Sequence, residues 1–290
     1  MTANSSRPMS GKTVLVTGGT AGIGLATAEG LARIGAAVAI TGRDRARAET
    51  AARQIRSAGG GHVHVFVADL SSQAEVRRLA DDVHTTLRSL DVLVNNVGGC
   101  WNTRHVTTDG LERTFALNHL APFQLTHLLL DRLREAPLPR VVTVASNAHS
   151  TGHIDFDDLQ GERSYSGARA YSQSKLANVL FSSELAGRAA GTSLTANSLH
   201  PGVVNTSFGA EDPGLVQRIL VPFARPFLKT PSQGAATSIR VAADPALRGV
   251  TGCYFAKGRP AESSQDSHDP IVAARLWRLS AELVGLADTD

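Results

Sequence analysis

The 290-residue sequence has little cysteine, and its two cysteines, Cys100 and Cys253, lie far apart in the chain. It contains no C-x-x-C pair, so neither a disulfide framework nor a cysteine zinc site is expected. Histidine is more frequent, with ten residues. However, pairs such as His149 and His153 have no Asp or Cys at a spacing that completes a ligand set. We therefore expect a reducing compartment and no bound metal.

Long apolar runs are also missing. None approaches the ~20 residues of a membrane-spanning helix, and the N-terminus "MTANSSRPMSGK" lacks the apolar segment of a secretion signal. These absences predict a cytoplasmic protein with no membrane partner, and residues 1–10 are expected to form a flexible tail. Lys and Arg are scattered around a net charge of +3, which argues against nucleic-acid binding but allows a local phosphate site.

What the sequence does have is an alternation of short apolar strands and amphipathic helices. Strands are expected at 12–17, 36–41, 62–69, 91–96, 140–146, 194–202 and 252–256. Helices are expected at 24–35, 44–57, 72–88, 109–134 and 169–189. Near-continuous apolar strands of this kind belong to a parallel sheet that is covered on both faces. No repeat or linker divides the chain, so residues 11–290 are predicted to form one doubly wound α/β domain of about seven strands.

The first strand is followed by the glycine-rich stretch "TGGTAGIG", residues 17–24. Gly18, Gly22 and Gly24 lie between a strand and a helix. Glycines there allow a tight turn and let backbone N–H groups approach a pyrophosphate at the helix N-terminus. The strand–turn–helix context predicts a nucleotide-binding site.

The stretch "AYSQSKLANVLF", residues 170–181, places Tyr171 one helical turn before Lys175. A cation beside a phenol lowers the phenol's pKa from its usual ~10. Such a tyrosine could exchange a proton with an alcohol or a carbonyl. The other two tyrosines lack this partner, because Tyr165 is followed at the same spacing by an arginine and Tyr254 by a glycine.

Together these motifs resemble the short-chain dehydrogenase/reductase family, which has a Rossmann-type fold. The spacing T-G-x-x-x-G-x-G is typical of that family, and its other elements follow in order over about residues 12–285. They are Asp69, "NNVG" (95–98), Asn118, Ser146, Tyr171 with Lys175, and "HPGVVNT" (200–206). Seven ordered matches are far more specific than any single motif.

The resemblance implies a role for each catalytic residue. Tyr171 would be the proton donor in reduction, and Lys175 would lower its pKa and hold the nicotinamide ribose. Ser146 would bond to the substrate oxygen and stabilise developing charge. Asn118 would anchor a water linking Lys175 to solvent. The implied cofactor-binding residues are Gly18, Thr20, Gly22, Ile23, Gly24, Arg43, Asp69, Leu70, Asn95, Val97, Gly98, Tyr171, Lys175, Pro201, Gly202, Val204 and Thr206.

The end of the second strand, "AITGRD", indicates which cofactor is preferred. An acidic residue at that place would bond to the ribose 2′-hydroxyl of NAD. Gly42 occupies it here, followed by Arg43, whose guanidinium can bind a 2′-phosphate. NADP(H) is therefore predicted over NAD(H). In the alternative, Arg43 is a solvated surface residue and Asp44 bonds to the ribose.

Ser146 and Tyr171 lie 25 residues apart, about twice the usual separation in the family, because of an insert at 147–170. The insert resembles the retinol-dehydrogenase-like subgroup, as do "LNHLAPFQLTHLLL" (117–130) and "LWRLSAELVGL" (276–286). Relatives in that subgroup commonly carry a membrane-associating N-terminus, and none is expected here. The segment 203–230, rich in Pro, Phe and Gly, is predicted to be a flap over the substrate.

The sequence therefore predicts an NADP(H)-dependent oxidoreductase acting on an apolar aldehyde, ketone or alcohol. The expected substrate-pocket residues are Ser146, Trp101, His149 and Phe208. Two alternatives stay open: an NADP(H)-sensing regulator without turnover, and an epimerase or dehydratase. The resemblance also implies a homo-oligomer, a dimer or a tetramer.

Overall fold

The computed structural model describes residues 7–59, 61–204 and 229–287. Its centre is one sheet in the order β3-β2-β1-β4-β5-β6-β7-β8. The strands are β1 (Thr13–Val16), β2 (Ala37–Gly42), β3 (Val63–Val67), β4 (Val92–Asn95), β5 (Arg140–Val144), β6 (Thr195–His200), β7 (Tyr254–Ala256) and β8 (Arg259–Pro260). The first seven are parallel, and β8 adds a two-residue antiparallel edge. The predicted Rossmann-type sheet is confirmed, with this short extra strand.

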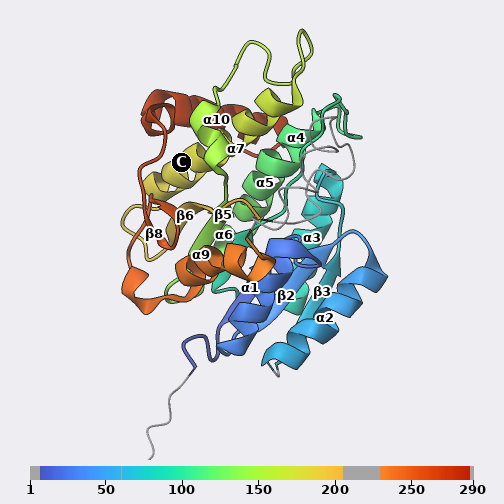
Figure 1. The fold of residues 1–290 in the computed structure, drawn as a ribbon, viewed down its shortest axis with the longest axis vertical. Coiled ribbons are helices and arrows are strands. Elements are labelled where there is room, and N and C mark those ends of the chain that lie inside the picture. Colours follow the sequence, from blue (N-terminus) through green and yellow to red (C-terminus); the bar gives the residue numbers. More distant parts are fainter. Residues whose placement is uncertain (1–6, 60, 205–228, 288–290) are drawn as a thin grey trace, which may run out of the picture.

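Helices cover both faces of the sheet (Figure 1). They are α1 (Gly22–Arg33), α2 (Arg45–Gly59), α3 (Gln73–Thr86), α4 (Arg113–Phe115), α5 (Ala121–Leu128), α6 (Leu130–Arg134), α7 (Gly167–Arg188), α9 (Pro231–Ala243) and α10 (Pro270–Leu283). Helices α1, α2 and α9 share one core with one face of the sheet, and α3, α5, α7 and α10 share a second core with the other face. None of the helices in this described part is long and apolar enough to cross a membrane.

Strand β1 shows why the apolar runs are nearly continuous. Val14 and Val16 pack into the core beneath α1, whereas Leu15 between them packs into the opposite core. Successive side chains of a strand point to opposite faces, so a strand covered on both sides must be apolar at every position. This explains why the central strands predicted from apolar runs agree with those in the structure.

The order of the strands fixes the place of the site. The chain moves outward from β1 to β2 and β3, then returns to place β4 on the other side of β1. The connections after β1 and β4 therefore diverge at the carboxyl edge of the sheet. In open α/β sheets this divergence leaves a crevice in which ligands bind.

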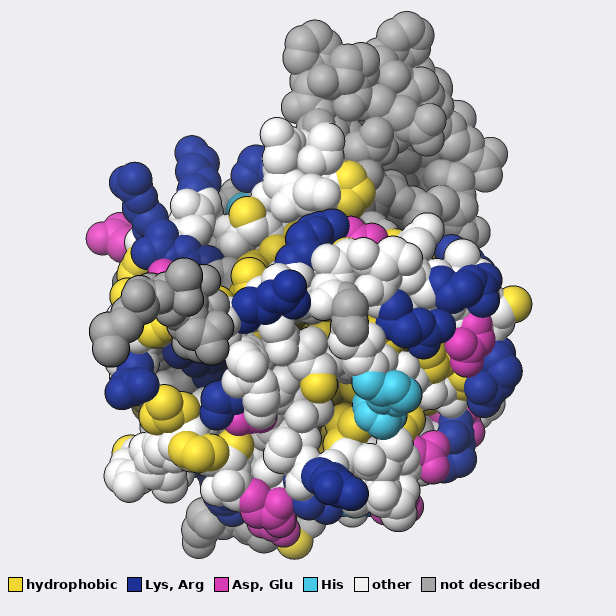
Figure 2. All heavy atoms as spheres, turned by 90° about the horizontal axis from the view of Figure 1, so that it is seen from below, with side chains coloured by type: hydrophobic (Ala, Val, Ile, Leu, Met, Phe, Trp, Pro, Cys, Tyr) yellow, Lys and Arg dark blue, Asp and Glu magenta, His cyan; other side chains and the backbone are white. Residues whose placement is uncertain are grey.

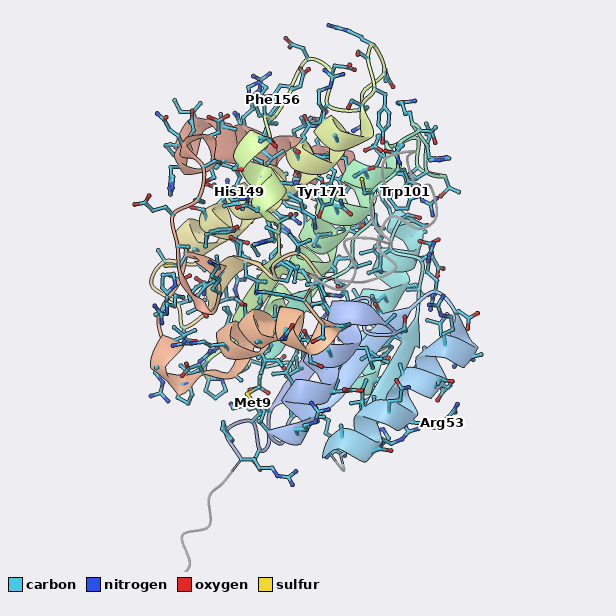
Figure 3. The ribbon with its side chains drawn as sticks, viewed as in Figure 1. Met9, Arg53, Trp101, His149, Phe156 and Tyr171 are labelled. Atoms are coloured by element: carbon cyan, nitrogen blue, oxygen red, sulfur yellow. The ribbon has the colours of Figure 1, made fainter. Side chains whose placement is uncertain are left out.

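The structure differs from the predicted elements in three places. The helix expected at 109–134 begins at Arg113 and contains a π-helical turn, η1 (Ala116–Leu120). Helices α9 and α10 were not predicted. Residues 7–10 of the expected tail form a turn instead, in which Met9 is buried and its N–H donates to Ile34 O. That turn lies at the end of the molecule away from the crevice (Figure 3).

Most of the predicted flap at 203–230 lies outside the described residues. Its described ends, Val204 and Lys229, pair in an isolated parallel bridge. The N–H of Lys229 donates to Val203 O at 3.0 Å. The segment therefore leaves and re-enters the described structure at one point.

Surface charge follows the composition. On the face shown in Figure 2, Lys and Arg side chains are spread out with Asp and Glu among them. Several pairs are bridged on single helices, such as Arg78 with Glu75 and Asp82 on α3. Exposed pairs of this kind contribute little to stability but keep the surface charge locally balanced.

Candidate active site

A cavity of about 730 Å³ opens at the carboxyl edge of the sheet, where β1 and β4 diverge. Its walls come from the turns after β1, β2, β3 and β4 and from α4. Ten of the predicted cofactor-binding residues line it: Gly18, Thr20, Gly22, Ile23, Gly24, Arg43, Asp69, Leu70, Val97 and Gly98. Four separate sequence motifs thus meet in one space.

The glycine turn after β1 is shaped for a close approach of backbone to a ligand. Gly18 and Gly22 have φ of 65° and 55°, a region that non-glycine residues rarely adopt. A Cβ on Gly24 would stand 2.3 Å from the Gly18 carbonyl oxygen. Helix α1 then begins without a side-chain cap, since Ala21 precedes it. The first-turn N–H groups are therefore available to an anion at the positive end of the helix.

The end of β2 lies directly beside this turn. A Cβ on Gly42 would stand 2.3 Å from the Thr20 methyl group, so a larger residue there would collide with the glycine turn. Arg43 and Arg47 both line the cavity next to Gly42. Asp44 lines it too, but its carboxylate accepts a hydrogen bond from the Arg47 N–H at 2.8 Å. This end of the cavity carries two cations and one acid that is engaged at the start of α2.

Of the predicted catalytic side chains, Tyr171 and Lys175 on α7 meet Ser146 just after β5, and none of these three is among the residues that line the cavity. The Tyr171 and Ser146 side chains share a hydrogen bond. The Lys175 ammonium lies 5.6 Å from the centre of the Tyr171 ring and donates to Val144 O at 3.1 Å. A Cβ on Gly98, at the cavity wall, would lie 3.4 Å from the Lys175 Nζ. The lysine therefore lies directly behind the cavity wall at Gly98, on the helix that carries the tyrosine.

The pKa values correct one expectation. Burial raises the pKa of Tyr171 to about 12, and the Ser146 hydrogen bond only partly opposes this. Burial also lowers the pKa of Lys175 to about 8. The predicted net lowering of the Tyr171 pKa is thus not found, because desolvation of the phenol is the largest effect. At neutral pH the phenol is protonated and the lysine is still mainly charged.

Asn118 sits on the π-helical turn and joins α7 to the loop after β4. Its carboxamide oxygen accepts from the Gly99 N–H at 2.7 Å, and its amide donates to Gly99 O at 2.9 Å. The same amide donates to the Ser174 hydroxyl at 2.9 Å, and Ser174 donates to Tyr171 O at 2.8 Å. Asn118 thus ties the cavity wall at Gly99 to the helix that carries Tyr171. Sequence reasoning missed Ser174, although it directly precedes Lys175.

Some predicted cofactor-binding residues lie elsewhere. Asn95 is buried and donates to the Thr126 hydroxyl at 3.0 Å, so its side chain points away from the cavity. Its neighbour Asn96 lines the cavity instead and donates to Thr17 O at 2.8 Å. The prediction chose the wrong one of two adjacent asparagines, because successive residues face opposite sides.

The stretch after β6 stays at the margin of the cavity. Pro201, Gly202 and Val204 are not among its lining residues. Val204 nevertheless approaches Ile23, since both lie next to Gly234 at the start of α9. Thr206 and Phe208 lie outside the described residues.

His149 does not belong to the substrate pocket, contrary to the prediction. Its Nδ1 lies 2.7 Å from Ser146 O, and its Nε2 accepts from the Ser264 N–H at 3.1 Å. Both ring nitrogens are therefore engaged with backbone, which makes Nδ1 the donor. Burial lowers the pKa of His149, so the ring is neutral at physiological pH. His149 fixes the backbone at Ser146 rather than facing a ligand.

Trp101 lines the cavity, and its contact with a substrate stays a prediction. Figure 3 places it at the same end of the molecule as Tyr171. The Arg113 guanidinium lies 4.2 Å from the centre of the indole ring. Cys100 and Leu117 complete this wall. Cys100 also lies close enough to Tyr171 and Lys175 to affect both of their pKa values. Arg113 and Leu117 were missed, because nothing in their local sequence marks them.

Residues 7–59, 61–204 and 229–287 contain no group of three or more His, Cys, Asp or Glu side chains that could hold a metal ion. His153 pairs with Asp266 at 3.9 Å on the surface, and His62 stacks edge-on against His64.

Comparison with known proteins places this geometry among relatives. A family model described as short chain dehydrogenase matches residues 12–213. Human retinol dehydrogenase 14 is 42% identical over 294 residues, which cover 96% of this chain and 88% of the human protein. Mouse retinol dehydrogenase 12 is 42% identical over 277 residues, which cover 95% of this chain and 87% of the mouse protein.

Solved structures agree. An uncharacterised protein from Mycobacterium paratuberculosis has 36% identity and a TM-score of 0.77, covering 96% of this chain and 94% of its own. RhlG from Pseudomonas aeruginosa, solved as an NADP active-site complex, has 30% identity and a TM-score of 0.69. That match covers 86% of this chain and 96% of RhlG.

Proposed function

The chain belongs to the short-chain dehydrogenase/reductase family and is retinol-dehydrogenase-like, and from this premise we propose that it is an NADP(H)-dependent carbonyl reductase or alcohol dehydrogenase. One observation carries the proposal: Tyr171 is hydrogen-bonded to Ser146 and lies one helical turn from Lys175, whose ammonium packs against Gly98 in the wall of the cavity built on the glycine turn. Tyr171 as proton donor, Ser146 as hydrogen-bond donor to an oxyanion and Lys175 as a buried cation would therefore lie next to the proposed nucleotide site.

The nicotinamide cofactor would supply the hydride. Tyr171 would donate its proton to the carbonyl oxygen, and Ser146 would bond to that oxygen as negative charge develops. With a pKa of about 12, Tyr171 is protonated at neutral pH, which suits reduction. Lys175 would stabilise the phenolate left after transfer. Asn118, in the proposed role, supports the return of the proton from solvent to Lys175.

The preference for NADP(H) rests on the end of β2. Arg43 and Arg47 line the cavity where a 2′-phosphate would lie, and the space for a side chain at Gly42 is taken by Thr20. Asp44 is held as an acceptor at the start of α2, which weakens the alternative in which it bonds to a ribose hydroxyl. Two cations against one engaged acid favour the cofactor that carries the additional phosphate.

The substrate is proposed to be an apolar aldehyde, ketone or alcohol. Two relatives are named retinol dehydrogenases, and Trp101 and Leu117 line the wall of the cavity near Tyr171. An aromatic and an aliphatic side chain at the wall favour an apolar substrate body.

A dimer or tetramer and a cytoplasmic location also stay predictions.

The test is oxidation of NADPH, and separately of NADH, with a panel of aldehydes and ketones. The panel runs from propanal to retinal and aryl ketones, and Tyr171→Phe is the catalytic control. We expect turnover with NADPH that is lost in the variant.

Arg43→Ala should raise KM for NADPH by about 10- to 100-fold and leave KM for NADH nearly unchanged, as loss of a charge-assisted phosphate contact predicts.

Two results would contradict the proposal. Equal use of NADH by the wild-type protein would refute the role of Arg43. NADPH binding without turnover on any member of the panel would favour a cofactor-sensing regulator. Isothermal titration with NADPH separates these outcomes, since it measures binding without chemistry.

A further inference from the structure

We propose that Tyr165, in the insert at 147–170, is a positioning residue for substrate recognition: its hydroxyl holds the Trp101 wall of the cavity in place. For its kinetic readout this inference rests on the proposed oxidoreductase function. The geometry that carries it is independent of that function. It joins two segments, the insert and the loop after β4, that are 64 residues apart in sequence.

The hydroxyl of Tyr165 is the meeting point. It lies 3.0 Å from the backbone oxygen of Trp101 and 3.2 Å from Oε1 of Glu112, and it can donate to both. The Thr114 hydroxyl lies 3.4 Å away and can donate in return. The one phenolic proton is thus shared between a carbonyl and a carboxylate, and the phenol oxygen can accept from Thr114.

Burial and the neighbouring Glu112 keep the phenol protonated. They raise the pKa of Tyr165 to about 12. Glu112 itself is 2% exposed, and its carboxylate also accepts from the N–H groups of Thr114 and Phe115 at 2.8 and 2.7 Å. It therefore caps α4 and serves Tyr165 at once. A donor to a buried carboxylate forms a stronger bond than a donor to a neutral group.

The insert holds the same loop at a second point. The side-chain oxygen of Gln160 accepts from the Glu112 N–H at 2.6 Å, and Gln160 O accepts from Arg104 Nε at 2.9 Å. The insert is in turn tied to the catalytic helix, since Gln173 of α7 donates to Leu159 O at 3.1 Å. The contacts form a bridge from α7, through the insert, to the loop that carries Trp101.

Trp101 has almost no room to move within this frame. A Cβ on Gly99 would stand 2.3 Å from its ring, and a Cβ on Gly167, the first residue of α7, would stand 2.3 Å from its carbonyl oxygen. Trp101 is 4% exposed, and its indole lies against the Arg113 guanidinium. The backbone oxygen of Trp101 accepts a hydrogen bond from the Tyr165 hydroxyl. Loss of this hydrogen bond would therefore loosen Trp101 at the cavity wall without directly displacing Tyr171.

Tyr165 is placed to affect substrate binding at Trp101 without affecting proton transfer at Tyr171. Asn118 and Ser174 connect the other end of the loop, at Gly99, to Tyr171. These contacts do not involve Tyr165, so its loss leaves them in place. A substrate long enough to touch Trp101 should therefore lose affinity, whereas a substrate that occupies only the space at Tyr171 should not.

The experiment compares Tyr165→Phe with Tyr254→Phe. Tyr165 is partly buried and Tyr254 is buried, and burial raises the pKa of each to about 12. Among the described residues, however, the Tyr254 hydroxyl has no hydrogen-bond partner. Steady-state kinetics with NADPH would use propanal and decanal as the short and long aldehydes. Acrylamide quenching of intrinsic tryptophan fluorescence would report on the solvent access of Trp101. The sequence has one other tryptophan, Trp277. Its contribution is measured separately in the Trp101→Phe variant and subtracted.

For Tyr165→Phe we expect KM for decanal to rise about three- to tenfold, with kcat and the propanal kcat/KM within about twofold of wild type. Quenching of Trp101 should increase, and Tyr254→Phe should match wild type in every measurement.

Unchanged decanal KM, or equal loss of kcat with both aldehydes, would overturn the proposal. If the wild-type protein reduced neither aldehyde, the proposed function would be at fault. Unchanged quenching in Tyr165→Phe would still refute the positioning role.

Discussion

The two ends of the cavity are built in different ways. At the cofactor end, the glycine turn and the start of α1 present backbone N–H groups, and the critical positions are those where a Cβ does not fit. At the reaction end, Trp101 lines the cavity, and Tyr171 and Lys175 lie next to the wall residues Gly98 and Cys100. Hydrogen bonds and packing hold these side chains in place. A short motif suffices for the first, whereas the second needs segments from across the chain.

This difference predicts opposite sensitivities. Adding one carbon should damage the cofactor end, because its shape depends on close backbone approach. Removing one hydroxyl should damage the reaction end, because its function depends on single donors. The following changes test that contrast in order of expected effect.

The largest effect is expected for Tyr171→Phe. Loss of the phenolic proton should lower kcat for carbonyl reduction by about 10³-fold, within the range of general acid catalysis. The ring stays, so the NADPH dissociation constant should change by no more than about twofold. Single-turnover kinetics and isothermal titration measure the two quantities. A variant that kept most of its turnover would show that another group is the acid.

Next comes Gly24→Ala, which places a methyl group 2.3 Å from Gly18 O and 2.5 Å from Asn96 Nδ2. Overpacking of this kind should weaken NADPH binding by about 10- to 100-fold. The matched control is Gly187→Ala on α7, where nothing lies within 4 Å of the added carbon. That control should bind NADPH normally and melt at an equal or higher temperature. Normal binding by Gly24→Ala would show that backbone approach does not define the cofactor end.

The pH dependence of reduction gives the third test. Lys175 has a pKa lowered to about 8, so its charge is lost as pH rises through that value, while Tyr171 stays protonated up to about 12. Reductive kcat/KM should be flat below pH 8 and then fall by about tenfold per pH unit. In Lys175→Arg, whose guanidinium stays charged, the falling limb should disappear even if the rate is lower. A flat wild-type profile to pH 10 would exclude the need for a charged lysine.

The smallest effect is expected for Ser174→Ala. It removes the hydroxyl that accepts from Asn118 and donates to Tyr171 O. The loss should lower kcat by about three- to tenfold, in line with one buried hydrogen bond. Ser182→Ala is the control, because Ser182 is also buried on α7 but donates to Asn178 O within the helix. Equal kcat values for the two variants would show that the Asn118–Ser174 link does not position Tyr171.

Much of the fold could be predicted because its signals are local. The strands are short apolar runs, the glycine turn follows the first of them, and Tyr171 and Lys175 lie one helical turn apart. Helix α10 could not be assigned in this way, although its Trp277 packs between Phe123 and Phe181. What α10 covers is decided by residues about 100 and 150 positions earlier in the chain.

The sequence by itself determined the sheet, the place of the glycine turn and the position of Lys175 one helical turn after Tyr171, since each depends on spacing along the backbone. Only the tertiary structure decided that Asn96 rather than Asn95 faces the cavity and that both nitrogens of His149 are engaged with backbone. It alone brought Tyr165 to Trp101 and raised rather than lowered the pKa of Tyr171. The physical reason is that burial and side-chain partners depend on segments that meet in space, and no local pattern specifies them.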